Sequence, residues 1–260
     1  MSKYFFCFLF PLFFFGCSLE KPREDTTEKE KMNFVQIEEE FYLPILCFHH
    51  VGESAKGASQ EVRDWYISKE KFESILIYLQ ENNYNTLFAS DLLHSMEEGK
   101  LPENSILLTF DDGSKTFYTN VYPLLKKYNM KAVMHIMSGV KGKFWLNTEE
   151  IQEMQKSGFV EFQSHTEYHA YLTRISDTEI KRELERSKKA LEEITGKPVE
   201  FIAYPFGLYD ERVMRIAKEV GYKGGFTIKR KHTQKRGEPL QLHRTIIMES
   251  MDIEDILQKP

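Results

Sequence analysis

Two adjacent carboxylates follow the apolar run 105–110, in the order Asp111-Asp112-Gly113. Adjacent carboxylates repel one another, and at a strand end each needs water, a cation or a hydrogen-bond donor. A divalent cation would meet that need if one carboxylate binds it while the other stays free to act as a base. The alternative is a simple turn, because Asp-Gly is a common turn pair.

Two histidines four residues apart follow a second apolar run, in the segment His165-Thr166-Glu167-Tyr168-His169. If the chain turns helically after His165, both imidazoles can face one ion. A histidine pair alone is weak evidence, since exposed and core histidines are common. Next to the Asp pair, however, one Asp and two His form a facial ligand set that leaves positions open for water and substrate.

A third motif, Ala203-Tyr204-Pro205-Phe206-Gly207, also follows an apolar run. Pro and Gly favour an irregular loop, in which an exposed backbone N–H could face an oxyanion. The alternative is a structural loop with packed aromatic side chains.

The elements that must position these motifs alternate between short apolar runs and helical patterns. We predict strands at 43–51, 105–110, 132–137, 160–163, 199–204, 225–228 and 245–248, and helices at 69–82, 118–128, 148–156, 177–194 and 211–220. This alternation predicts parallel strand–helix–strand units. About seven units predict an α/β fold with a distorted (β/α)7-type barrel as a single catalytic domain, whose active site lies at the carboxyl ends of the strands.

Composition limits the classes of partner. The chain has 260 residues and a net charge of −5, with acidic and basic residues mixed along it. There is no basic patch of the kind that binds nucleic acid, so we expect no nucleic-acid partner. A mildly acidic surface suits a neutral or cationic polymer. We expect a monomer.

The first residues are typical of an exported protein. Lys3 precedes an apolar run at 4–15, which is too short to span a bilayer as a mature helix. Gly16-Cys17 resembles the end of a bacterial lipobox, so we predict a lipoprotein-type signal at 1–17 with Cys17 lipidated. The alternatives are an ordinary signal peptide and secretion, or an uncleaved anchor. Residues 18–41 are highly charged and predict a flexible tether, followed by the catalytic domain at 42–260.

The cysteines predict no internal disulfide. Cys7 lies in the signal and Cys17 would carry the lipid, which leaves Cys47 alone in the domain. Cys47 lies in an apolar run and is expected in the core.

In this order, the three motifs resemble the polysaccharide deacetylases of carbohydrate esterase family 4, the NodB homology domain, over residues 43–248. The segment 109–113 matches the family's first motif, and 165–169 matches its His-[Ser/Thr]-x-x-His motif. The resemblance implies that Asp111 is the catalytic base and that Asp112, His165 and His169 hold a divalent metal. Zn²⁺ is the expected ion, although Ni²⁺, Co²⁺ or Fe²⁺ would fit the same ligands.

The remaining family motifs match less closely. The third motif is usually Arg-x-Pro-[Phe/Tyr], but Ala203 stands at the Arg position, so the usual Arg partner of the catalytic Asp is missing. The segments 204–207 and 45–51 look like the branch that acts on poly-β-1,6-N-acetylglucosamine. The late Asp-x-x-x-Trp element has no counterpart after Gly207.

Four further residues have two interpretations each. Leu242-His243-Arg244 lies in the region of the family's Leu-x-His motif but with a different spacing, so His243 is a candidate general acid or a histidine at a strand edge. Arg244 could replace the missing Arg or form a surface ion pair. His49 could contact sugar or pack in the core. Trp145 could stack on a sugar ring or cap the following helix.

The predicted function is metal-dependent removal of N-acetyl groups from a polysaccharide that contains N-acetylglucosamine, either poly-N-acetylglucosamine or peptidoglycan, with release of acetate. Asp111 would take a proton from water, and His243 would protonate the leaving amine. The Phe206 N–H, beside Tyr204, would face the oxyanion. The alternatives are a glycan-binding module that has lost turnover, or a deacetylase of other acetylated carbohydrates.

Overall fold

The computed structural model describes Met1 and residues 33–258, so the predicted signal and most of the predicted tether lie outside the described residues. The chain divides into two units, 1–31 and 32–260, and the description below concerns the second. Among the described residues, none of the helices has the length and apolar character needed to cross a membrane.

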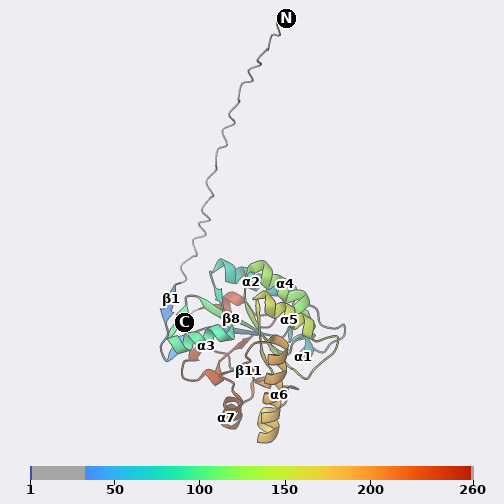
Figure 1. Ribbon diagram of the computed structural model, residues 1–260, viewed down its shortest axis with the longest axis vertical. Helices are drawn as coiled ribbons and strands as arrows, with labels where there is room; N and C mark the ends of the chain where they lie inside the picture. The colour runs from blue at the N-terminus through green and yellow to red at the C-terminus, as the bar shows by residue number, and fades with distance from the viewer. Residues whose placement is uncertain (2–32, 259–260) are drawn as a thin grey trace. The chain divides into compact units, whose positions relative to one another are not determined.

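A curled parallel sheet forms the centre of the domain, with strand order β12-β11-β10-β9-β8-β3-β14 (Figure 1). An isolated parallel bridge between Phe226 and Leu242 links β12 to the residues that lead into β14. The predicted distorted barrel is therefore confirmed. The strands are β3 (Ile45–Phe48), β8 (Ser105–Phe110), β9 (Ala132–Ile136), β10 (Val160–Ser164), β11 (Phe201–Ala203), β12 (Gly224–Phe226) and β14 (Thr245–Ile246).

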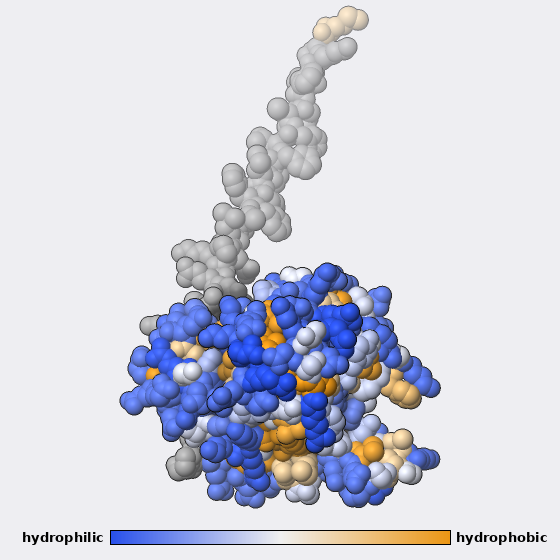
Figure 2. Space-filling view, turned by 90° about the horizontal axis from the view of Figure 1, so that it is seen from below, coloured by the Kyte–Doolittle hydropathy of each residue, from blue (hydrophilic) through white to orange (hydrophobic). Residues whose placement is uncertain are grey.

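Helices surround these strands (Figure 1). The predicted helices form at α2 (Lys69–Glu81), α4 (Tyr122–Tyr128), α5 (Thr148–Ser157), α6 (Asp177–Thr195) and α7 (Glu211–Val220). Side-chain caps begin several of them; Ser176, for example, accepts a hydrogen bond from the Glu179 N–H and starts α6. The helices bury one apolar face each, and the face in Figure 2 is largely hydrophilic with separate hydrophobic patches.

Several short elements were not predicted. They are α1 (Gln60–Arg63), α8 (Ile253–Leu257), β6 (Asn85–Thr86), and the helical turns η2 (Leu172–Arg174), η3 (Pro205–Gly207) and η4 (Pro239–Gln241). The ten-residue helix α3 (Ala89–Glu98) was also missed, although it buries Ala89, Leu92 and Met96 on one face. The start of the helix predicted at 118–128 is the π-helical turn η1 (Phe117–Val121).

Three small sheets flank the central one. They pair β1 (Phe34–Gln36) with β7 (Lys100–Pro102), β2 (Glu40–Tyr42) with β13 (Thr233–Lys235), and β4 (His50–Val51) with β5 (Tyr66–Ile67). Ile37 and Phe41 are buried in the core. The ordered elements therefore begin before Tyr42, where the sequence led us to expect the domain to start.

Candidate active site

The three predicted motifs meet at the carboxyl ends of β8, β10 and β11. A cleft of about 230 Å³ opens there, and it contains the predicted Asp and His residues. Its lining consists of His49, His50, Trp65, Asp111, Asp112, His165, His169, Tyr204, Phe206, Gly207, Ile228 and Ile246. Three larger hollows, of about 620, 650 and 480 Å³, lie elsewhere and contain none of the predicted site residues.

Asp112, His165 and His169 converge as the motifs predict. The Oδ1 atom of Asp112 lies 3.4 Å from Nε2 of His165 and 3.9 Å from Nε2 of His169. Donors bound about 2.1 Å from one ion lie roughly 3 to 4 Å apart, so these separations fit a divalent cation. The Nδ1 atom of His165 is 2.8 Å from the carbonyl oxygen of Ala203, which can only accept a hydrogen bond. Nδ1 therefore carries the proton, and the lone pair on Nε2 is available to the metal.

The two histidines have different electrostatic surroundings. Burial, together with His165, lowers the pKa of His169 to about 4, so its imidazole is neutral near pH 7. Burial alone would lower the pKa of His165, but the carboxylates of Asp111 and Asp112 outweigh it and raise that pKa. A bound cation would take the place of the proton on Nε2 of His165.

The segment after His165 forms a turn at residues 166–168 and does not have the helical conformation that the sequence suggested. Thr166 and His169 have positive φ angles of 66° and 59°, which are unfavourable for residues other than glycine. Side-chain hydrogen bonds stabilise them. Thr166 Oγ1 accepts from the His169 N–H at 2.9 Å, and the buried Glu183 accepts from the Tyr168 N–H at 2.9 Å. This strained turn brings His169 back toward Asp112.

Arg244 replaces the arginine that is missing at Ala203. Its Nη1 and Nη2 atoms donate to the two carboxylate oxygens of Asp111 at 2.8 and 2.7 Å, a bidentate pair. The side chain is fully buried, and Nε donates to the Thr227 carbonyl at 2.9 Å. The alternative that Arg244 forms a surface ion pair is therefore wrong.

Arg244 determines the charge state of Asp111. Burial alone would raise the pKa of Asp111, but the Arg244 guanidinium, with His165 and His135, holds it well below its usual range. Asp111 therefore remains a carboxylate at neutral pH.

His135 is a site residue that the sequence analysis missed. It lies on β9, and its Nδ1 atom is 2.8 Å from Oδ1 of Asp111. Burial lowers the pKa of His135 to about 4, so the ring is neutral and donates from Nδ1. The Nε2 atom is buried without a hydrogen-bond partner among the described residues. The available signal was a histidine inside the otherwise apolar strand Ala132–Ile136.

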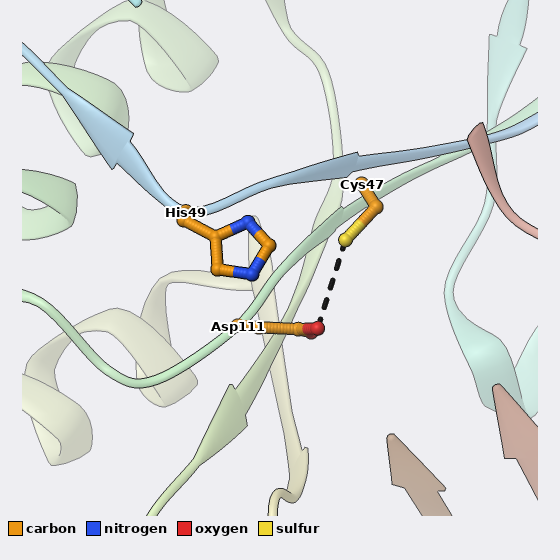
Figure 3. A group of neighbouring side chains, drawn as sticks. All are labelled: Cys47, His49 and Asp111. Carbon is orange, nitrogen blue, oxygen red and sulfur yellow. Dashed lines mark hydrogen bonds between the residues drawn. The ribbon is translucent and has the colours of Figure 1, made fainter. Parts of the chain in front are cut away.

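Cys47 on the neighbouring strand β3, and His49 directly after that strand, lie close to Asp111 (Figure 3). The buried Cys47 thiol lies 3.6 Å from Oδ2 of Asp111, and the potential ligand atoms of all three residues lie within 4.8 Å of one another. A cation is less favoured in this group, since Arg244 already neutralises Asp111. His49 also lines the cleft, so it is not merely a core residue.

Gly113 allows the turn that follows the two carboxylates. Its φ angle is +86°, and a Cβ atom there would lie 2.8 Å from Cδ1 of Ile136. A larger residue would be strained at this φ angle and would have to push aside the end of the Ile136 side chain.

The structure does not bring three of the predicted residues into reacting positions. The His243 ring is 2.9 Å from the Thr233 carbonyl, away from the cleft lining. Trp145 also lies outside that lining, and Asn147 caps the next helix instead. Tyr204 forms part of the inner wall, but its hydroxyl donates to the Leu240 carbonyl at 3.1 Å.

Comparison with known proteins agrees with this geometry. Residues 98–225 match the family model described as polysaccharide deacetylase. The chain is 30% identical over 205 residues to the poly-beta-1,6-N-acetyl-D-glucosamine N-deacetylase of Staphylococcus aureus, covering 74% of this chain and 71% of that one. The Streptococcus pyogenes deacetylase PplD, solved with acetate, superposes with a TM-score of 0.78 at 27% identity, covering 85% of this chain and 99% of that one. A polysaccharide deacetylase from Bacillus cereus gives 0.73 at 31% identity, over 83% and 67%.

Proposed function

Since the chain belongs to the polysaccharide deacetylase family, we propose that it hydrolyses N-acetyl groups of an N-acetylglucosamine polymer in a metal-dependent reaction. The observation that carries the proposal is the convergence of Asp112, His165 and His169 beside the ionised Asp111. Poly-β-1,6-N-acetylglucosamine is the first substrate to test, because the Staphylococcus aureus relative is named for it. Peptidoglycan is the second.

The ligand set would hold Zn²⁺, or Ni²⁺, Co²⁺ or Fe²⁺, and the ion would supply Lewis-acid activation of water and of the acetamide carbonyl. Asp111 accepts the proton of the attacking water. Its carboxylate is held in place by Arg244 and His135, so no reorientation is needed during proton transfer.

The Phe206 N–H is our candidate donor to the oxyanion, as the Pro-Phe-Gly loop at the cleft suggests. Phe206 lines the cleft with a φ angle of 59°. The following Gly207 makes this loop possible, because a Cβ atom there would lie 2.3 Å from Ile228.

His49 is a better-placed proton donor for the leaving amine than His243. Its ring lines the cleft next to Asp111, whereas the His243 ring lies on the Thr233 carbonyl. Burial lowers the pKa of His49 despite the nearby carboxylates. His49 would therefore take up the proton during the reaction, from Asp111 or from water, and pass it to the amine.

Trp65 offers a surface for a sugar ring. It lines the cleft, remains 44% exposed, and contacts His49 at a ring-centroid distance of 4.5 Å. Its exposed surface can stack on a pyranose ring, as aromatic residues do in many binding sites.

We expect Trp65→Ala to raise the KM for N-acetylglucosamine oligomers by about 5- to 10-fold, corresponding to the loss of roughly 1 kcal/mol of stacking, and to change kcat less. Steady-state acetate release measures both constants. Phe144→Ala, which removes an exposed ring outside the cleft lining, is the matched control. An unchanged KM would remove Trp65 from the substrate site.

The function is tested by measuring acetate and free amine released from β-1,6 and β-1,4 N-acetylglucosamine oligomers side by side, before and after chelation. We expect release that stops on chelation and returns with Zn²⁺. No release with any of the four metals, together with retained glycan binding, would establish the binding module instead. Release only from O-acetylated sugars would establish an esterase.

We also propose that the protein works outside the cytoplasm, anchored through Cys17. The support is the charged start and apolar run at 3–15 followed by Gly16-Cys17. Radiolabelled palmitate should be incorporated by the wild-type chain and not by Cys17→Ser. Equal labelling of the two would exclude this anchor.

A further inference from the structure

We propose that Tyr171, with Arg174, is a positioning residue that clamps Phe206 against His169 and so fixes both the metal ligand and the oxyanion donor. The inference rests on the proposed function, since it concerns the same site.

The clamp is a column of stacked side chains. Arg174 lies over the Tyr171 ring, 4.6 Å from its centroid. The Tyr171 and Phe206 rings are stacked with centroids 3.9 Å apart and an interplanar angle of 7°. Phe206 then meets His169 at 4.4 Å and 64°. The column therefore connects an exposed turn directly to a metal ligand.

The column is poorly suited to bind sugar. One face of Tyr171 is covered by Arg174 and the other by Phe206. Tyr171 is 40% exposed and Phe206 is 39% exposed, but each ring covers one face of the other. Sugar stacking requires an open ring face, so positioning explains this arrangement better than substrate binding does.

His169 needs such support because its ring lacks the hydrogen bond that orients His165. The Nδ1 atom of His165 donates to the Ala203 carbonyl at 2.8 Å. For His169, the described residues provide only the 3.9 Å approach of Nε2 to Asp112 and ring contacts with His165 and Phe206. A metal-binding histidine is normally oriented by a partner on its second nitrogen. Here the packing of Phe206 performs that role.

The same contact constrains the backbone of Phe206. A non-glycine residue at a φ angle of 59° persists only where its surroundings hold it. The ring of Phe206 lies between Tyr171 and His169, which restricts its rotation and therefore the direction of the N–H. Tyr171 thus helps to orient both the His169 imidazole and the Phe206 N–H without touching substrate.

The test is to measure Zn²⁺ affinity by competition with a chromogenic chelator, in parallel with kcat and KM. Tyr171→Ala should weaken Zn²⁺ binding by about 2- to 10-fold, the loss expected for one aromatic pair, and lower kcat more than it raises KM. Tyr171→Phe retains the ring and should restore both values. Tyr171→Leu keeps apolar bulk without a ring face and should behave like the Ala variant.

Phe144→Ala serves as the control for removing an exposed ring, and its Zn²⁺ affinity should equal that of the wild type. Wild-type affinity in folded Tyr171→Ala and Tyr171→Leu, with or without a raised KM, would overturn the proposal. Zn²⁺ binding is measured without substrate, so the two proposals can fail separately. If the wild type released no acetate but Tyr171→Ala still weakened Zn²⁺ binding, the proposed function would be wrong and the clamp would be supported.

Discussion

Arg244→Met should destabilise the fold by about 3 to 5 kcal/mol and lower kcat/KM by on the order of 100-fold. The substitution removes both hydrogen bonds to the Asp111 carboxylate and leaves that buried charge without its cation. Urea unfolding and steady-state kinetics measure the two effects. Arg244→Lys keeps the charge but loses the bidentate geometry, so it should fall between the wild type and the Met variant.

Arg215→Met is the matched control. Arg215 pairs with Asp177 and Glu219 on the surface, where all three side chains are about half exposed, so its loss should cost at most about 1 kcal/mol. If Arg244→Met were as stable and active as this control, Arg244 would not be the partner on which Asp111 depends.

The loss of unfolding free energy in Arg244→Met should depend on pH. The pKa of Asp111 is lowered in the folded protein, so its ion pair stabilises the fold above the unfolded pKa of about 3.9 and loses this effect as the pH falls. The difference in unfolding free energy between wild type and Arg244→Met should therefore shrink below about pH 4.

Asp111→Asn should lower kcat by about 10²- to 10⁴-fold, the range for loss of a general base. Asp112, His165 and His169 are unchanged in this variant, so metal content after dialysis should equal that of the wild type. Acetate release and metal analysis of the same preparation separate the two properties. Asp112→Asn, in contrast, should lose metal and activity together.

Activity of Asp111→Asn within tenfold of the wild type would show that another group accepts the proton. His49 would then be the group to replace next, since it lines the cleft beside Asp111.

The convergence of the three candidate metal ligands could be predicted, because each belongs to a short motif that follows an apolar run. Asp112 is the second residue after β8, and His165 lies directly after β10. Parallel strands place their carboxyl ends at one edge of a sheet, so strand order alone brings these side chains together. The alternation of strands and helices likewise sufficed for the barrel.

The sequence left two alternatives open for Arg244 and gave no role to His135, because the partners of Asp111 depend on which side of its strand each side chain points to. His243 and Arg244 are adjacent and lead into β14, and neighbouring side chains of extended chain point to opposite sides. Arg244 enters the barrel, 133 residues from its partner Asp111, while His243 faces the Thr233 carbonyl outside. The side chain that points into the barrel therefore belongs to Arg244 and not to the predicted acid His243, one residue earlier.

Trp65 escaped prediction for a different reason. It lies between α1 and β5, in a stretch without helical or strand periodicity, and only the pairing of β5 with β4 brings it to His49. The turn at 166–169 was also hidden, since two positive φ angles at non-glycine residues leave no signature in the sequence.

We propose that Asp112, His165 and His169 together hold one catalytic metal ion. The most direct measurement is a Zn²⁺ titration of chelator-treated protein while acetate release from a β-1,6 N-acetylglucosamine oligomer is followed. We predict no release without metal and a linear rise that stops at about one ion per chain. Full acetate release from the metal-free protein would contradict the account.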